Sequence, residues 1–270
     1  MSFRGASAEA FASLTTDLDG TVSGAPETVA RVGGDLFSVS GVLRTEAGLR
    51  RVLTDVSVAP GAKAGLVRDI FGDKAVDSVV TLVASAVAKR WTVGRDLPDA
   101  LERLGVLATV KSAGSDTGRL SDELFEIGQL VKNTPELRDA FSDPARSRED
   151  KRTLVHTLFD NKALPATVAL VDQALAGTYR TVGVALAEYQ QAAAEVHGQS
   201  VAEVRVANDL SEADRQRLTD VLSRQYGRAV HLNVVVDPSV IGGLRVEIGD
   251  DVIDGTVSNR LSEAGRKLAG

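Results

Sequence analysis

Between residues 29 and 196, apolar side chains recur at alternating spacings of three and four residues, the period at which a helix buries one face. The segments are Val29-Val32-Leu36-Val39-Leu43, Val76-Val80-Val83-Val87, Leu97-Leu101-Leu104-Ala108, Leu120-Leu124-Ile127-Val131, Leu164-Val168-Val171-Leu175 and Val182-Leu186-Tyr189-Ala193-Val196. Short connections separate them, as they do between antiparallel helices of a bundle. The pattern therefore predicts helical bundles over most of the chain.

Part of this helical region occurs twice, at an offset of 88 positions and without a gap. The matched pairs are Leu36-Phe37 with Leu124-Phe125, Leu49-Arg50 with Leu137-Arg138, Asp55 with Asp143, Lys63 with Lys151, Leu66-Val67 with Leu154-Val155, Phe71 with Phe159, and Lys74-Ala75 with Lys162-Ala163. Mismatches such as Val42 against Leu130 stay apolar. We expect two related helical bundles, residues 1–112 and 113–198, with the Gly/Ser-rich residues 111–118 as the linker between them.

From residue 199 the hydrophobic period changes to two, which indicates strands. Alternating segments are Ala202-Val204-Val206, Leu232-Val234-Val236 and Leu244-Val246-Ile248. Between the first two, a helix is expected to begin at a cap formed by Ser211 and Asp214 and to end at Gly227. A last helix would place Val257, Leu261, Ala264 and Leu268 on one face. Residues 199–270 thus predict a small β-α-β-β-α domain, so that the fold class is mainly α with a small α+β C-terminal domain.

Composition narrows the classes of function. Hydrophobic residues make up 43% and charged residues 25% of the 270 residues, as in folded proteins. The formal net charge of −6 argues against nucleic acid as a partner. The absence of cysteine excludes disulfides, thiolate zinc sites and cysteine nucleophiles. No run of about 18 apolar residues occurs, so we expect no direct membrane insertion.

Motifs of catalysis are missing from the sequence. There is no phosphate-binding G-x-x-x-x-G-K-[ST] string and no G-x-S-x-G nucleophile elbow. His156, His197 and His231 are scattered, without a partner at metal-ligand or general-base spacing. Asp250, Asp251 and Asp254 lie in predicted turns, where aspartate forms local hydrogen bonds. We expect no catalytic residue, no metal and no cofactor.

The run from Val236 to Leu261 resembles the C-terminal signature of ATP synthase delta subunits, the family of the mitochondrial oligomycin sensitivity conferral protein. The matching positions are Asp237, Pro238, Val240, Ile241, Gly242, Gly243, Leu244, Val246, Ile248, Gly249, Asp254, Val257 and Leu261. They are expected to be structural or interface positions. The glycine pair is expected to adopt a backbone conformation closed to larger residues.

A second stretch is similar to the helical domain of the same family, with Thr134 inserted. It contains Asn133, Pro135, Glu136, Leu137, Asp143, Pro144, Lys151, Leu154, Leu158 and Phe159. The earlier copy departs further, with Ala47 and Val56 in place of the two prolines. A duplicated helical domain resembles the long delta subunits of actinobacteria.

The resemblance implies a non-catalytic peripheral-stalk (stator) subunit of an F-type ATP synthase, the complex that couples hydrogen ion transport to ATP synthesis. Its partners would be the N-terminal region of an alpha subunit in the F1 head and the b subunits, with one copy per complex. Its place would be the cytoplasmic face of the bacterial cell membrane, as a peripheral protein. Two alternatives stay open on the residues alone: a helical scaffold of another assembly, and an enzyme whose site is assembled by the fold.

Overall fold

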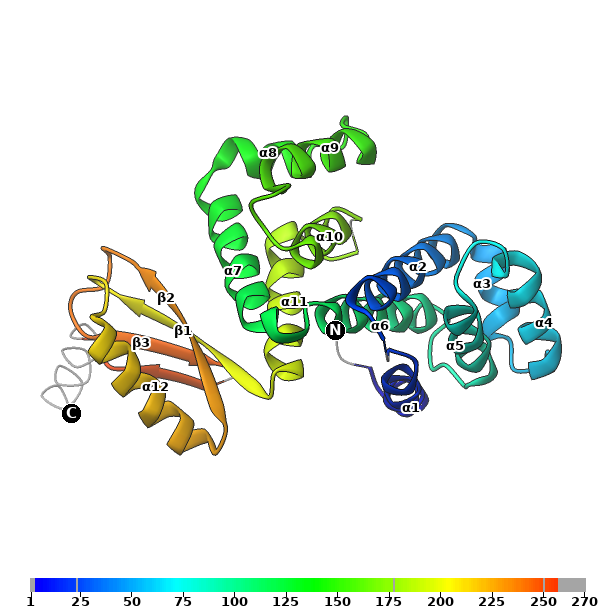
Figure 1. The fold of residues 1–270 in the computed structure, drawn as a ribbon, viewed down its shortest axis with the longest axis horizontal. Helices are drawn as coiled ribbons and strands as arrows, with labels where there is room; N and C mark the ends of the chain where they lie inside the picture. Colours follow the sequence, from blue (N-terminus) through cyan, green and yellow to red (C-terminus); the bar gives the residue numbers. More distant parts are fainter. Residues whose placement is uncertain (1–2, 23, 177, 250, 257–270) are drawn as a thin grey trace, which may run out of the picture. The chain divides into compact units, whose positions relative to one another are not determined.

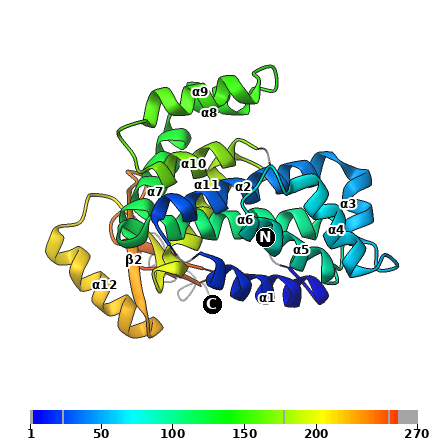
Figure 2. The same cartoon turned by 45° about the vertical axis from the view of Figure 1, so that its right-hand side comes forward.

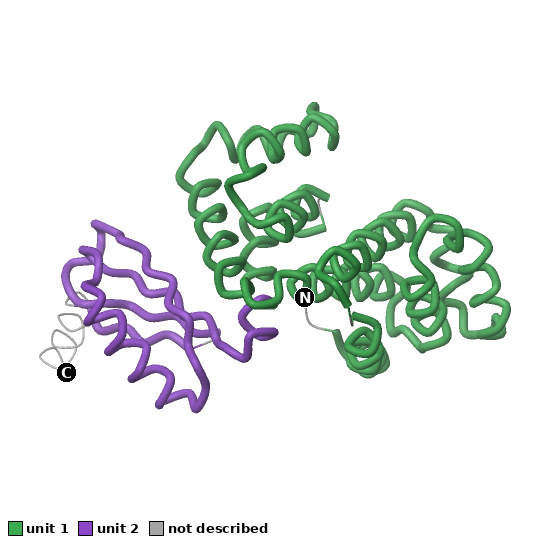
Figure 3. Tube along the Cα trace, in the orientation of Figure 1, with its two compact units in different colours: residues 1–192 green, residues 193–270 purple. Residues whose placement is uncertain are grey.

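The computed structural model describes residues 3–22, 24–176, 178–249 and 251–256. The chain divides into two compact units, Met1–Ala192 and Ala193–Gly270 (Figure 3). The first unit is helical and the second holds a four-stranded sheet (Figure 1), which confirms the predicted fold class. No described helix combines the length and the apolar character needed to cross a membrane.

The helices of the first unit repeat with the 88-residue offset found in the sequence. In order they are α1 (Ala6–Thr21), α2 (Pro26–Thr45), α3 (Ala47–Thr54), α4 (Pro60–Phe71), α5 (Asp77–Ala88), α6 (Asp96–Ser112), α7 (Thr117–Asn133), α8 (Pro135–Ser142), α9 (Arg148–Phe159), α10 (Pro165–Ala174) and α11 (Val182–Val196). The bounds of α3 and α4, moved by 88, coincide with those of α8 and α9. The same offset places α1 on α6 and α6 on α11. Hence α6 is the last helix of a first copy (α1–α6) and the first helix of a second copy (α6–α11).

The sharing of α6 explains why this helix is buried on several sides. Leu97, Leu101, Leu104 and Ala108 belong to the core of the first copy. Pro98, Glu102 and Val106, also buried, stand where α1 has its own core residues Ala10, Leu14 and Leu18. A helix that packs in two copies needs two buried faces, whereas α1, which packs in one copy, buries a single narrow row of residues.

The connection at residues 111–118, predicted as a linker, is short in the structure. Its first residues end α6, a single 3₁₀ turn (Gly114–Asp116) follows, and α7 begins at Thr117. A flexible linker has no place between two copies that share a helix. The division at residues 112 and 113 stays a prediction.

Helices α2 and α6 lie side by side in both views (Figures 1 and 2). Two glycines permit this close packing. A Cβ atom on Gly105 would lie 2.7 Å from the ring of Phe37, and one on Gly33 would collide with Thr109. At the other end of the pair, the hydroxyl of Ser40 donates to the Pro98 carbonyl at 2.7 Å.

The second unit has the sheet order β2-β1-β3-β4, with β1 and β2 parallel and the other pairs antiparallel. Its elements are β1 (Gln199–Val206), α12 (Glu212–Tyr226), β2 (Ala229–Val236), β3 (Leu244–Ile248) and β4 (Asp251–Asp254). Helix α12 begins at the predicted cap, where Ser211 accepts from the Asp214 amide, and ends at Gly227 with φ 68°. Leu222 of this helix shares one buried core with Ala202, Val204 and Val246 of the sheet.

The structure adds one strand, β4, to the predicted order. It pairs with β3 and directly precedes the residues assigned to a last helix. That helix, with Val257, Leu261, Ala264 and Leu268, lies outside the described residues.

Candidate functional site

The signature of the second unit is built around two aspartate turns. The Asp237 carboxylate accepts hydrogen bonds from the amide and the hydroxyl of Ser239, at 2.9 and 2.6 Å. Asp254 does the same with the amide and the hydroxyl of Thr256, at 3.0 and 2.7 Å. The Thr256 hydrogen bonds lower the pKa of Asp254. Pro238 follows directly in the first turn, where its fixed φ suits a chain reversal. These side chains therefore shape the backbone locally.

The glycine pair between the two turns has the backbone conformation expected from its position. Gly242 has φ 65° and Gly243 has φ 80°, in the left-handed region that favours glycine. A Cβ atom on Gly243 would collide with the carbonyl oxygen of Gly255 and lie 3.0 Å from the Thr256 Cα. The Gly255 amide donates to the Leu244 carbonyl at 2.9 Å. The two chain segments thus meet backbone to backbone, which a side chain would prevent.

The other signature positions fall into different environments. Val246 is buried in the sheet, and Gly249 (φ 58°) forms the turn between β3 and β4. Ile241 is 69% exposed, and Val236 at the end of β2 is 49% exposed. Val257 and Leu261 lie outside the described residues. Two apolar side chains of this segment are therefore exposed, one at the end of β2 and one in the turn that follows.

The first unit contains a hollow that no sequence motif had singled out. It has a volume of about 350 Å³ and lies between α7 and the C-terminal end of α9 with the connection that follows it. Its lining residues, which we call the α7–α9 groove, are Glu123, Glu126, Ile127, Leu130, Phe159, Lys162 and Ala163. Leu130 is 44% exposed, and its counterpart in the first copy, Val42, is 37% exposed. The sequence did contain one indication of this groove, because an apolar residue stands at the same exposed position in both copies.

One wall of the groove is held by Glu123. Its carboxylate accepts hydrogen bonds from the Leu164 amide at 2.8 Å and from the Thr167 hydroxyl at 2.5 Å, at the start of α10. In the first copy, the Asp35 carboxylate accepts from the Val76 amide at 2.8 Å, at the start of α5. These residues are 88 positions apart. The carboxylate has the same structural task in both copies.

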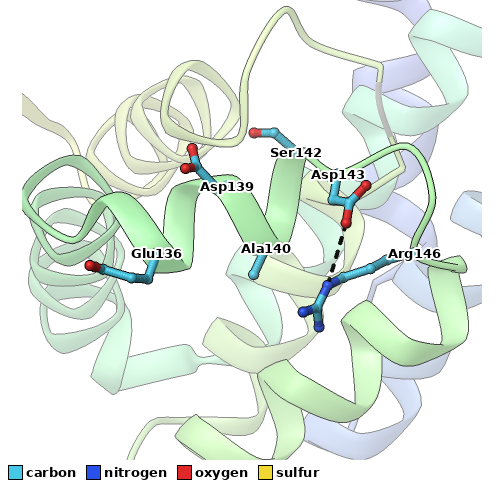
Figure 4. Close-up of a pocket in the computed structure, with 6 residues that line it drawn as sticks. All are labelled: Glu136, Asp139, Ala140, Ser142, Asp143 and Arg146. Atoms are coloured by element: carbon cyan, nitrogen blue, oxygen red, sulfur yellow. Dashed lines mark ion pairs between the residues drawn. The ribbon is translucent and has the colours of Figure 1, made fainter.

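A second hollow, of about 460 Å³, lies at α8 (Figure 4). Arg146 points toward Asp143, with 3.7 Å between guanidinium and carboxylate, whereas Glu136 and Asp139 point away from this pair. The lining side chains do not converge on a common point. This arrangement has no geometry for holding a ligand.

His156 connects α9 to α10. Its Nδ1 lies 3.0 Å from Asp160 and its Nε2 lies 3.2 Å from Asp172. The hydrogen bond to Asp160, together with the charge of Asp172, raises the pKa of His156. His197 follows α11 and His231 lies in β2, so the structure does not bring the three histidines into one site. Within the described residues, no group of histidine and carboxylate side chains is arranged to hold a metal ion.

Comparison with known proteins gives a consistent result. The family model described as ATP synthase delta (OSCP) subunit matches residues 105–268. The ATP synthase subunit delta of Nocardioides sp. is 53% identical over 270 residues, 100% of this chain and 98% of that protein. The corresponding subunits of Kineococcus radiotolerans (42% identity, 94% of this chain and 93% of that protein) and Streptomyces avermitilis (37%, 100% of each) are also similar.

Proposed function

The chain belongs to the ATP synthase delta (OSCP) subunit family, a component of the peripheral stalk, and on this basis we propose that it connects the F1 head to the b subunits. In this role it is a non-catalytic stator subunit, which holds the head against rotary torque during proton-driven ATP synthesis. The observation that carries the proposal is the extent of similarity, since relatives match the chain from end to end. One copy per complex, peripheral at the cytoplasmic face of the membrane, completes the proposal.

We assign the head contact to the second copy. The family match begins at Gly105, inside α6, and therefore covers the second copy from the middle of α6 onward and most of the tail, but not α1 to α5. In that copy the α7–α9 groove presents Ile127, Leu130 and Phe159 beside charged Glu126 and Lys162. An apolar floor with a charged rim suits the apolar face of an amphipathic helix. The N-terminal region of an alpha subunit is the proposed occupant.

The b subunits are assigned to the second unit. The exposed Ile241 and Val236 lie beside the Asp237 turn. Gly242 and Gly243 have the positive φ values at which this segment approaches the backbone of Gly255 and Thr256. Pre-ordered apolar side chains bind with a smaller loss of conformational entropy than mobile ones. They are suited to a permanent attachment.

The assignment of the head contact can be tested with two matched variants. Leu130→Asp places a charge in the groove, and Val42→Asp makes the same change at the equivalent position of the first copy. We expect Leu130→Asp to weaken binding to purified F1 by about tenfold or more, as for a contact at the centre of an interface, and Val42→Asp to leave it unchanged. Calorimetric titration of F1 with each full-length variant measures the affinity. The reverse result would move the contact to the first copy.

The function itself is tested by affinity purification from solubilised membranes of the host. Alpha, beta and b chains should co-purify with the tagged protein, and the isolated chain should release no phosphate from ATP. Recovery of a different assembly would contradict the proposal. ATP hydrolysis that persisted after removal of all F1 would contradict its non-catalytic part.

A further inference from the structure

A carboxylate occupies a core position in the second copy. Glu102 of α6 is 2% exposed. Its counterpart in the first copy is Leu14, which is fully buried in an apolar core. Likewise, the buried Tyr189 of α11 stands where the first copy has Leu101. At these two core positions, the first copy therefore has apolar residues and the second copy has polar ones.

Glu102 is held by side chains from two other helices. One carboxylate oxygen accepts from the Arg44 guanidinium of α2 at 2.6 Å, and the other accepts from the Gln173 amide of α10 at 2.6 Å. Arg44 also donates to Asp99 at 2.8 Å and to the Thr178 hydroxyl at 3.2 Å. Helix α2 belongs to the first copy alone and α10 to the second alone. The cluster therefore joins the two copies across the helix that they share.

The charges of this cluster depend on one another. Partial burial opposes the charge on Arg44, but Glu102 and Asp99 outweigh it and raise the pKa of the guanidinium. Burial, with the charge of Glu102 nearby, raises the pKa of Tyr189. A buried ion pair of this kind contributes little net stability compared with apolar side chains of similar volume. Its charge-assisted hydrogen bonds, however, have a specific geometry and join side chains from three helices.

We propose that Arg44, Glu102 and Gln173 form a lock that fixes the second helical copy in one orientation on the first. Apolar contacts between α2, α6 and α10 tolerate small rotations, because they are not directional. The hydrogen bonds of Glu102 do not, since a rotation of α10 against α2 would separate Gln173 or Arg44 from the carboxylate. The lock itself does not depend on the proposed function. Its purpose, to transmit force in a stator, rests on that function.

The lock is tested by measuring the distribution of distances between the two copies. The chain has no cysteine, so spin labels can be attached at cysteines that replace Val56 in the first copy and Glu149 in the second, both exposed. Electron–electron double resonance on the full-length protein should give a narrow distribution. Arg44→Gln should broaden it. Arg138→Gln, which removes an exposed arginine from α8, is the matched control and should leave it narrow.

Glu102→Leu decides the question. This variant introduces the residue that the first copy has at the equivalent position, so we expect it to fold, but to melt below the wild-type temperature, because Gln173 loses its acceptor while Arg44 keeps only Asp99 as a carboxylate partner. Its distance distribution should also be broader than that of the wild type. A folded Glu102→Leu variant with an unchanged, narrow distribution would overturn the proposal. The measurement requires no ATP synthase partner, so its outcome is independent of the test of function.

Discussion

Asp55, Asp143, Asp237 and Asp254 share one local geometry, in which the carboxylate accepts a hydrogen bond from the amide two residues later. The distances are 2.8, 2.8, 2.9 and 3.0 Å. Asp55 and Asp143 are repeat partners, and the other two belong to the C-terminal signature. Hydrogen bonds to the ionised carboxylate lower the pKa of Asp55 and of Asp254. Their contribution to stability is therefore present above the ordinary pKa of aspartate, about 3.9, and is lost as the pH falls through the lowered values.

At the same scale, Gly243→Val should destabilise the second unit. A β-branched residue at φ 80° costs on the order of 1–3 kcal/mol, and the collision with the Gly255 carbonyl adds to that cost. Thermal unfolding of the full-length protein, followed by circular dichroism, measures the change.

The control for this prediction is Gly249→Ala. Gly249 also has a positive φ, of 58°, but a Cβ atom there would meet nothing within 4 Å. The control should therefore lose less stability than Gly243→Val. Equal losses in the two variants would mean that the close approach to Gly255 is unimportant.

At the scale of elements, the cap that one helix provides for another is a recurrent device. Glu123→Ala should destabilise the first unit by about 0.5–2 kcal/mol, the usual range for loss of a helix cap, because the Leu164 amide and the Thr167 hydroxyl lose their acceptor. Urea unfolding followed at 222 nm measures this change. Glu126→Ala, one turn away and exposed, is the control and should stay within about 0.5 kcal/mol of the wild type. Similar losses of stability in the two variants would show that Glu123 does not act as a cap.

The helices with a strong hydrophobic period could be predicted from the sequence, and so could the change to strands at residue 199. The double role of α6 could not. Its row Leu97, Leu101, Leu104 and Ala108 marks one face, while the second buried face contains Glu102, which a hydrophobic pattern counts as exposed. Strand β4 was missed because Val252 and Ile253 are adjacent in a strand of four residues, too short for an alternation.

The candidate sites divide in the same way. The positive φ of Gly242 and Gly243 was predictable, because few other residues adopt it, whereas Asp251 and Asp254, expected in turns, belong to strand β4. The α7–α9 groove and the Arg44–Glu102–Gln173 cluster were not. Each brings together residues from helices far apart in the sequence, and only the packing of those helices brings them together.

For the whole molecule, we expect the two proposed attachments to separate on truncation. The units meet at Ala192 and Ala193, inside α11, so a cut after residue 198 leaves that helix complete. Residues 1–198 should bind F1, and residues 199–270 should bind a soluble b-subunit peptide. Calorimetry measures both. Neither fragment alone should restore proton-driven ATP synthesis, since resisting torque requires both attachments in one chain.

Folding of the small fragment must be checked first, because a domain of this size is near the lower limit of independent stability. Retained near-wild-type circular dichroism for its strands and helix is the criterion. A folded tail that bound F1 as tightly as the full chain and ignored the b peptide would contradict the division.

The shared helix also determines how a chain of this kind can lengthen. A second copy needs only the helices from α7 to α11, because α6 already serves as its first helix. Each junction between copies is therefore a continuous helix rather than a loop. Gene duplication in steps of 88 residues would lengthen such a protein without adding a loop between copies, and an insertion within the shared helix would disturb both copies at once.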